Sequence, residues 1–168
     1  NCNAANARHM HPKVEQRLLD IAEYADTAAF NRIEWRDRSL GIITSGVIYA
    51  YVSDVFPEAS VLKLGMTHPL PKKLIQEFAA GVEKLVVIEE LDPVLEEQIR
   101  AMGIEVIGKE IFPPCLELLP DDIKRYSAKA GLLPKDEKQE TEAFKDIPVR
   151  TPVLCAGCPH RSTFYLLN

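Results

Sequence analysis

The sequence lacks the features that mark membrane, secreted and nucleic-acid-binding proteins. Its 168 residues contain no apolar run close to the roughly 20 residues that span a bilayer, and no signal-peptide pattern. A formal net charge of −5 argues against a surface for nucleic acid or an anionic membrane. Four cysteines do not make a disulfide framework in a chain of this length. We therefore expect a cytoplasmic protein with reduced thiols that binds neither nucleic acid nor membrane.

Signatures of nucleotide-binding loops are also missing. Gly41 and Gly46 have the outer spacing of a phosphate loop, but no lysine follows Gly46. No Gly-x-Gly-x-x-Gly run occurs anywhere in the chain. We interpret residues 40–46 as a buried strand that turns into a helix, with Ser45 as the helix cap and Gly46 at the turn.

A strand-then-helix pattern repeats after this corner. Short runs rich in β-branched and large apolar residues predict strands at 41–44, 60–64, 85–88 and 104–107. Helices are predicted between them, ended by Pro57, Gly81 and Gly103, with Asp92 capping the last of these helices. Strands that alternate with helices and lack hairpin signals predict parallel pairing. The predicted fold class is therefore α/β, a three-layer sandwich with a mainly parallel sheet.

The flanking segments set the predicted domain boundaries. A helix is expected from Pro12 to about Ala25, with one apolar stripe for packing, and another from Pro120 to about Ala130. The predicted divisions are a tag or cloning remnant at 1–10, the N-terminal helix and connection at 11–39, the α/β domain at 40–133, a charged linker at 134–151, and the truncated start of a further domain at 152–168.

Candidate functional side chains follow the predicted strands. Glu89 and Glu90 come directly after the strand at 85–88, and His68 lies in the loop after the strand at 60–64. Open α/β sheets place their ligands at this edge, so these side chains are candidates for cofactor binding. The glutamates can also act in acid–base chemistry, or one of them can support a neighbouring loop or a helix N-terminus.

The Cys155-x-x-Cys158 pair is the sharpest chemical signal. Thiolates at this spacing can bind one zinc ion or one iron of a cluster. The pair supplies half of a four-ligand site, and His160 is the nearest further donor. The alternative is that these are two thiols without a metal near a domain boundary.

Several runs of residues occur together, in this order, in one known family. They are residues 31–35, 41–46, 61–67 with 69–71, 89–93 and 155–161. Together they resemble the alpha subunit of indolepyruvate:ferredoxin oxidoreductase, and the match extends from about Pro12 to the last residue. The family usually has proline where this chain has Ala156, a departure that leaves both thiols in place.

The resemblance implies a thiamine-dependent 2-oxoacid:ferredoxin oxidoreductase. Such enzymes decarboxylate arylpyruvates oxidatively, release an aryl-acetyl-CoA and pass electrons through iron–sulfur clusters to ferredoxin. Residues 40–133 would be the transketolase C-terminal-like domain, which packs the catalytic domains and the beta subunit together and contains no catalytic residue. Residues 152–168 would begin the domain that binds thiamine diphosphate and magnesium, with Cys155 and Cys158 as iron–sulfur ligands. No cofactor is expected on the isolated chain.

Two other functions remain open on the residues alone. One is a stand-alone module that binds a small molecule at His68 and Glu89, which predicts a ligand that raises the melting temperature without redox activity. The other is an interaction domain stapled by zinc at Cys155 and Cys158, which predicts stability that a chelator removes.

Overall fold

The computed structural model describes residues 3–134 and 154–167, which fall into two compact units, 1–135 and 136–168. Each unit is described by itself. The predicted charged linker, 134–151, lies outside the described residues except for Pro134. Within the described residues, no helix is both long enough and apolar enough to cross a membrane.

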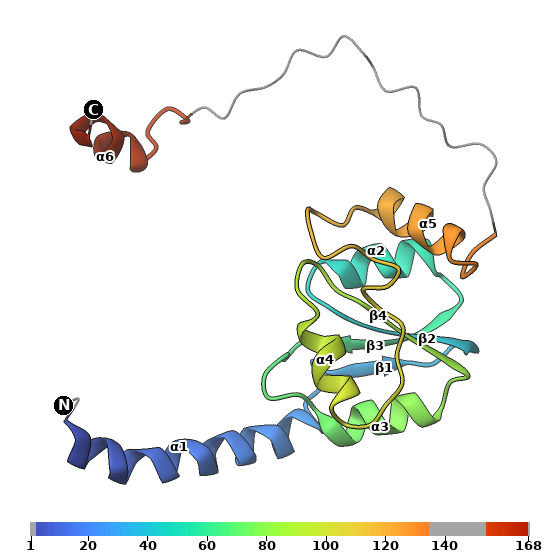
Figure 1. Ribbon diagram of the computed structural model, residues 1–168, viewed down its shortest axis with the longest axis horizontal. Coiled ribbons are helices and arrows are strands. Elements are labelled where there is room, and N and C mark those ends of the chain that lie inside the picture. Colours follow the sequence, from blue (N-terminus) through green and yellow to red (C-terminus); the bar gives the residue numbers. More distant parts are fainter. Residues whose placement is uncertain (1–2, 135–153, 168) are drawn as a thin grey trace. The chain divides into compact units, whose positions relative to one another are not determined.

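A mainly parallel four-stranded sheet forms the centre of the first unit (Figure 1). Its strands are β1 (Arg32–Glu34), β2 (Asp37–Ser45), β3 (Ala59–Leu64) and β4 (Lys84–Ile88), in the order β1-β3-β2-β4. β2 pairs in parallel with both β3 and β4, whereas the short edge strand β1 runs antiparallel to β3. The prediction of a mainly parallel sheet is confirmed.

Helices cover both faces of this sheet. The helices of the first unit after the opening one are α2 (Ile48–Val55), α3 (Lys72–Ala80), α4 (Val94–Arg100) and α5 (Pro120–Lys129). In Figure 1, α2 and α5 lie on one side of the strands, and α3 and α4 lie on the other. The predicted three-layer arrangement is therefore confirmed, and the helix predicted over 120–130 is present.

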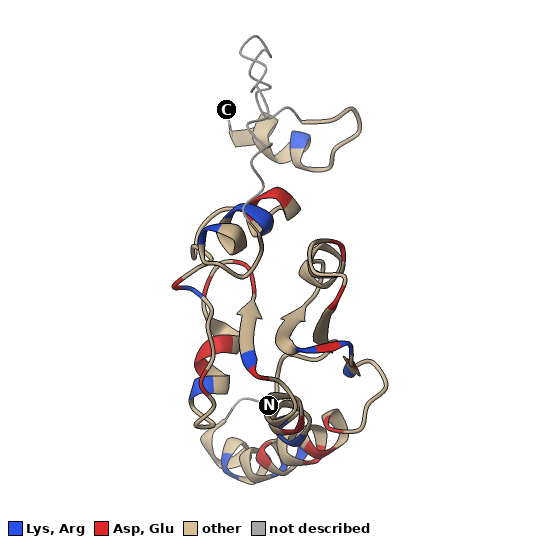
Figure 2. Ribbon diagram, turned by 90° about the vertical axis from the view of Figure 1, so that its right-hand side faces the viewer, with Lys and Arg blue, Asp and Glu red and all other residues tan. Residues whose placement is uncertain are grey.

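Alternation along the strands produces two hydrophobic cores, one on each face. Ile42 packs with α2 and α5, whereas its neighbour Ile43 packs with α3 and α4. Successive strand residues point to opposite faces, so a strand covered on both sides is apolar throughout. Figure 2 shows the consequence, since charged residues lie mostly on the helices and loops and the middle of the sheet is uncharged.

The opening helix, α1 (Ala4–Ala25), begins earlier than Pro12, where the sequence predicts its start. The Asn3 side chain accepts a hydrogen bond from the Asn6 N–H at 2.8 Å and caps this end, and Pro12 lies inside the helix. Ala25 is the buried residue of α1, and most of the apolar stripe is exposed or half-buried. Figure 1 shows why, because α1 extends away from the sheet.

Three local predictions are wrong. Residues 104–107 form a single parallel bridge, Val86 to Ile107, instead of a full fourth strand, because only Ile107 exchanges hydrogen bonds with β4. Ser45 belongs to β2, and α2 starts after Val47 without a side-chain cap. Asp92 does not cap α4, because the Glu89 side chain bonds to the N–H groups at that end.

Candidate functional site

The carboxyl ends of β2, β3 and β4 lie at one edge of the sheet, where parallel sheets usually bind ligands. The predicted residues Glu89 and Glu90 follow β4 directly, and His68 lies in the loop after β3. β2 separates these two strands in the sheet. The structure therefore brings the glutamates together with the segment after residue 107, and it does not join them to His68, whose side chain is exposed.

Glu89 is the most deeply buried of the predicted residues, at 8% exposure. Its Oε2 accepts the Leu95 N–H at 2.8 Å and its Oε1 accepts the Glu96 N–H at 3.0 Å. A carboxyl group in this position accepts hydrogen bonds from two unpaired N–H groups in the first turn of α4. It also lies at the positive end of the helix dipole, where negative charge is stabilised. Of the roles predicted for the two glutamates, Glu89 has that of supporting a helix N-terminus.

A second buried carboxylate, Glu96, lies beside it at 3% exposure and was not found by sequence reasoning. Its Oε2 accepts the Lys109 N–H at 2.8 Å, and its Oε1 forms an ion pair with Arg100 at 2.9 Å. The Lys109 ammonium donates to the Glu89 carbonyl. These contacts fasten the segment around residue 109 to both ends of the β4–α4 connection. The i, i+4 spacing of Glu96 and Arg100 was the signal available in the sequence.

Burial shifts the titration of two members of this cluster. It raises the pKa of Glu89 above its ordinary value, against the lowering effects of the Glu96 and Leu95 N–H groups and of the Lys109 charge. Burial also lowers the pKa of Lys109, although the surrounding carboxylates, Glu89 first, oppose that change. Both shifts have the same cause, the loss of hydration by a charged group.

Glu90 performs a similar task on the neighbouring loop. Its Oε1 accepts the N–H of Leu118 at 3.3 Å, and Leu118 itself is buried under α5. The Glu89 and Glu96 carboxylates, and one Glu90 oxygen, accept hydrogen bonds from backbone N–H groups. The arrangement is suited to holding loops in place. It leaves no carboxylate pair poised for acid–base chemistry among the described residues of this edge.

The end of β3 is held by a residue that sequence reasoning did not assign a role. Asn31, at 6% exposure, accepts the Gly65 and Met66 N–H groups through Oδ1 at 2.8 and 3.0 Å. Its Nδ2 donates to the Ala25 carbonyl at 2.8 Å, so one side chain joins the end of α1 to the loop after β3. Asn31 belongs to the run 31–35 that carries the family resemblance, and that was the available signal.

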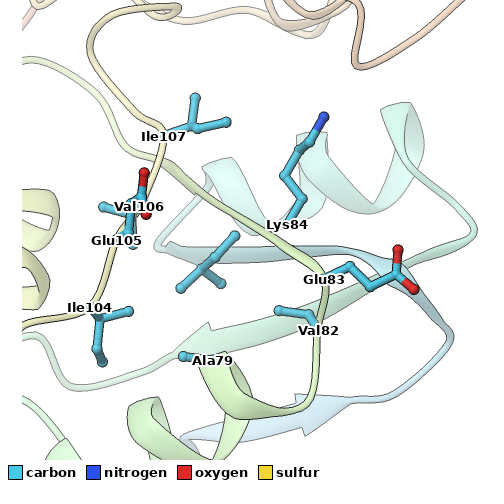
Figure 3. A pocket seen from close by; sticks show the side chains of 9 residues that line it. Ala79, Val82, Glu83, Lys84, Ile104, Glu105, Val106 and Ile107 are labelled. Carbon is cyan, nitrogen blue, oxygen red and sulfur yellow. The ribbon is translucent and has the colours of Figure 1, made fainter.

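A cavity of about 420 Å³ opens at the opposite edge of the sheet, where β4 begins (Figure 3). The single bridge at Ile107 lets residues 104–106 diverge from β4, and the space lies between them. Figure 3 shows Ala79, Val82 and Ile104 on its walls. Its charged lining residues are Glu83, Lys84 and Glu105, and it contains no nucleophile or histidine. We assign no chemistry to it.

The Cys-x-x-Cys pair lies in the second unit, before α6 (His160–Leu167). The Cys158 N–H donates to the Cys155 carbonyl at 3.1 Å, and Gly157 takes a left-handed φ of 78° in this turn. The Cys158 Sγ lies 3.5 Å from His160 Nδ1. The described residues contain no group of three or more side chains that could hold a metal ion. Two thiols on one turn fit half of the ligand set of a four-cysteine centre.

Comparisons with known proteins agree on one group of enzymes, although no family model matches the chain. Subunit IorA of the indolepyruvate oxidoreductase from Archaeoglobus fulgidus is 34% identical over 181 residues, and that from Thermococcus kodakarensis is 33% identical over 183 residues. Each match covers 98% of this chain. The chain spans only 28% of the length of these curated relatives.

A solved structure has a related fold. The 2-oxoglutarate:ferredoxin oxidoreductase from Magnetococcus marinus, with 2-oxoglutarate, coenzyme A and succinyl-CoA bound, matches with a TM-score of 0.57 over 77% of this chain and 24% of that one. At 22% identity this likeness shows the fold alone. The sequence matches to the IorA subunits cover almost the whole chain, and about one third of the aligned residues are identical. Over almost its whole length, the chain is therefore similar to one stretch of the indolepyruvate oxidoreductase IorA subunits.

Proposed function

We propose that this chain is the scaffold domain of an oxidoreductase that decarboxylates arylpyruvates, such as indolepyruvate, to aryl-acetyl-CoA with ferredoxin as electron acceptor. The observation that carries the proposal is the match of 98% of the chain, at 34% identity, to a subunit named for indolepyruvate oxidation. Its partners would be the beta subunit, ferredoxin, CoA and the arylpyruvate. The parent enzyme would act in anaerobic metabolism.

The engagement of the edge carboxylates supports a scaffold role. The Glu89, Glu90 and Glu96 side chains each accept a hydrogen bond from a backbone N–H of a neighbouring segment, so their carboxyl oxygens hold loops in place. The isolated chain is therefore expected to be inactive.

The parent enzyme would need thiamine diphosphate with magnesium and iron–sulfur clusters. Cys155 and Cys158 would supply two of the thiolates of one cluster, which would carry electrons away from the oxidised substrate. Under this proposal, thiamine diphosphate binds to other parts of the enzyme. The candidates for contact with a cofactor at the sheet edge remain His68, Glu89 and Glu90. The two glutamates already accept hydrogen bonds from backbone N–H groups.

The test is anaerobic and uses the full-length parent subunit co-expressed with its beta partner. Viologen reduction is followed with indolepyruvate, CoA and thiamine diphosphate, and the 168-residue chain is the control. We expect CoA-dependent reduction by the complex and none by the isolated chain. Activity with pyruvate or 2-oxoglutarate but not with indolepyruvate would overturn the assignment of arylpyruvates as substrates. Arylpyruvate oxidation by the isolated chain would overturn the scaffold role.

A further inference from the structure

Two leucines at the carboxyl edge of the sheet have an unusual backbone conformation. Leu91 has a φ of 54° and Leu116 a φ of 67°, and among the described residues they are the non-glycine positions with positive φ. Left-handed backbone is unfavourable for a bulky residue and is found mainly at glycine, asparagine and aspartate. Both side chains are also exposed, Leu91 at 55% and Leu116 at 82%. Because both side chains are largely exposed, packing within this unit does not offset the unfavourable backbone conformation.

The two leucines share one surface. Together with Glu90 and Glu117 they line a shallow depression of about 560 Å³, which we call the leucine patch. The loops that carry it come from different parts of the chain, after β4 and before α5. They are tied by the hydrogen bond from the Leu118 N–H to Glu90 Oε1, at 3.3 Å.

The loops below the patch are anchored to the core. Leu118, beside Leu116, is buried in the core under α5, and the Glu89 carbonyl receives the Lys109 ammonium. These contacts reduce the freedom that the loops would lose on binding, which favours association. Exposed apolar side chains on a fixed framework mark sites of protein association.

The charges around the patch define its partner. Glu90, Asp92 and Glu117 are exposed beside the leucines, whereas the nearby Lys109 is half-buried and directed at the Glu89 carbonyl. An apolar centre with an acidic rim fits an apolar pocket rimmed by lysine or arginine. Such a partner would gain from burial of the leucines and from the charge pairs at the rim.

We propose that the leucine patch docks into a basic-rimmed apolar pocket on another domain of the same subunit. The IorA relatives extend well beyond the stretch matched here, because this chain spans only 28% of their length. A domain in the same polypeptide is present at a high effective concentration, so a modest patch suffices to hold it. The proposal rests on the scaffold role proposed above, and it adds the surface and the chemistry of the contact.

Native Cys115 provides the test, because its thiol is exposed and adjoins Leu116. Its rate of alkylation by N-ethylmaleimide is measured by mass spectrometry in the 168-residue chain, in the full-length subunit alone and in the complex with the beta subunit. We expect rapid labelling in the isolated chain and at least tenfold slower labelling in the full-length subunit alone. Equal rates would overturn the proposal. Protection that appears only with the beta subunit would also overturn it, since the partner would then be the other subunit.

A variant separates docking from folding. Asparagine tolerates left-handed backbone, so Leu91→Asn with Leu116→Asn removes the apolar side chains without lowering the melting temperature of the isolated chain. In the full-length subunit the double variant should restore Cys115 labelling to within about twofold of the isolated-chain rate. Leu19→Asn, an exposed leucine on α1, is the matched control and should leave protection intact. Protection that survives the double variant would refute the proposal. No substrate enters this assay, so a wrong substrate assignment does not affect it.

Discussion

A β-carbon at Gly108 would lie 2.1 Å from Oε2 of Glu96. This oxygen accepts the Lys109 N–H, and the other oxygen of the same carboxylate pairs with Arg100. The absence of a side chain at position 108 thus lets the backbone approach a buried charge closely enough to bind it. That contact fixes the segment that follows the single bridge at Ile107.

Gly108→Ala should lower the free energy of unfolding by about 1–3 kcal/mol, because a methyl group has no room unless the carboxylate moves. Urea unfolding followed by circular dichroism measures the effect. Glu96→Ala removes the obstructing carboxylate, so the penalty of Gly108→Ala should be smaller in that background. An equal penalty in both backgrounds would place the strain elsewhere.

Asn31→Ala should lower the free energy of unfolding by about 2 kcal/mol, because it removes the partners of two N–H groups and one carbonyl. Asn31→Asp is the matched control. Aspartate can still accept from Gly65 and Met66 but cannot donate to the Ala25 carbonyl. The free energy of unfolding of Asn31→Asp should therefore lie between that of the wild type and that of Asn31→Ala. An Asp variant as unstable as the Ala variant would contradict this division of roles.

Asp26→Ala should cost about 1 kcal/mol, since the Asp26 Oδ1 accepts the N–H groups of Lys73 and Leu74 and caps α3 from outside the helix. Asp26→Asn keeps an acceptor oxygen and should recover part of the loss. Thermal unfolding of the three proteins measures both effects. Equal melting temperatures for the wild type and the Ala variant would show that water replaces the cap at no cost.

The fold was predictable because its strands are short, continuous apolar runs separated by helices. Ile42 and Ile43 pack on opposite faces of a strand covered on both sides, and runs of this kind identify parallel strands directly. Residues 104–107 have the same composition, yet only Ile107 pairs with β4. Composition determines that a segment is suited to a strand, whereas the course of the chain on either side determines whether it reaches its neighbour.

The details of the site depend on contacts across the chain that no local pattern reports. Glu89 was correctly selected as a residue at the strand end, but its bonds to Leu95 and Glu96 depend on where α4 begins. Gly81 was predicted to end α3 through its conformational freedom. Its φ of −92° is open to any residue, and the reason for glycine is that a β-carbon would lie 2.4 Å from the Trp35 ring. The position was correct and the cause was tertiary packing.

The free energy of unfolding should depend on pH in mild acid because of Glu89. Burial raises its folded pKa above the ordinary value of 4.5, so the folded chain retains a proton that the unfolded chain releases. The contribution of this group is full below 4.5 and is lost as pH rises through the raised pKa. Glu89→Gln does not titrate. The unfolding free energy of the wild type minus that of Glu89→Gln should therefore fall as the pH rises from 4.5 through the raised pKa of Glu89. A difference that grows with pH would contradict burial as the dominant cause.

Cys155→Ser with Cys158→Ser distinguishes a cluster ligand pair from a zinc staple. The two thiols lie in the second compact unit, and the described residues contain no third and fourth ligand grouped with them. The double variant should therefore leave the melting temperature of the isolated chain unchanged, and a chelator should do the same. In the full-length complex it should abolish the electron paramagnetic resonance signal of one reduced cluster, with Cys115→Ser as the control that retains it. If the chelator lowers the melting temperature of the isolated chain, zinc is structural here and the iron–sulfur assignment is wrong.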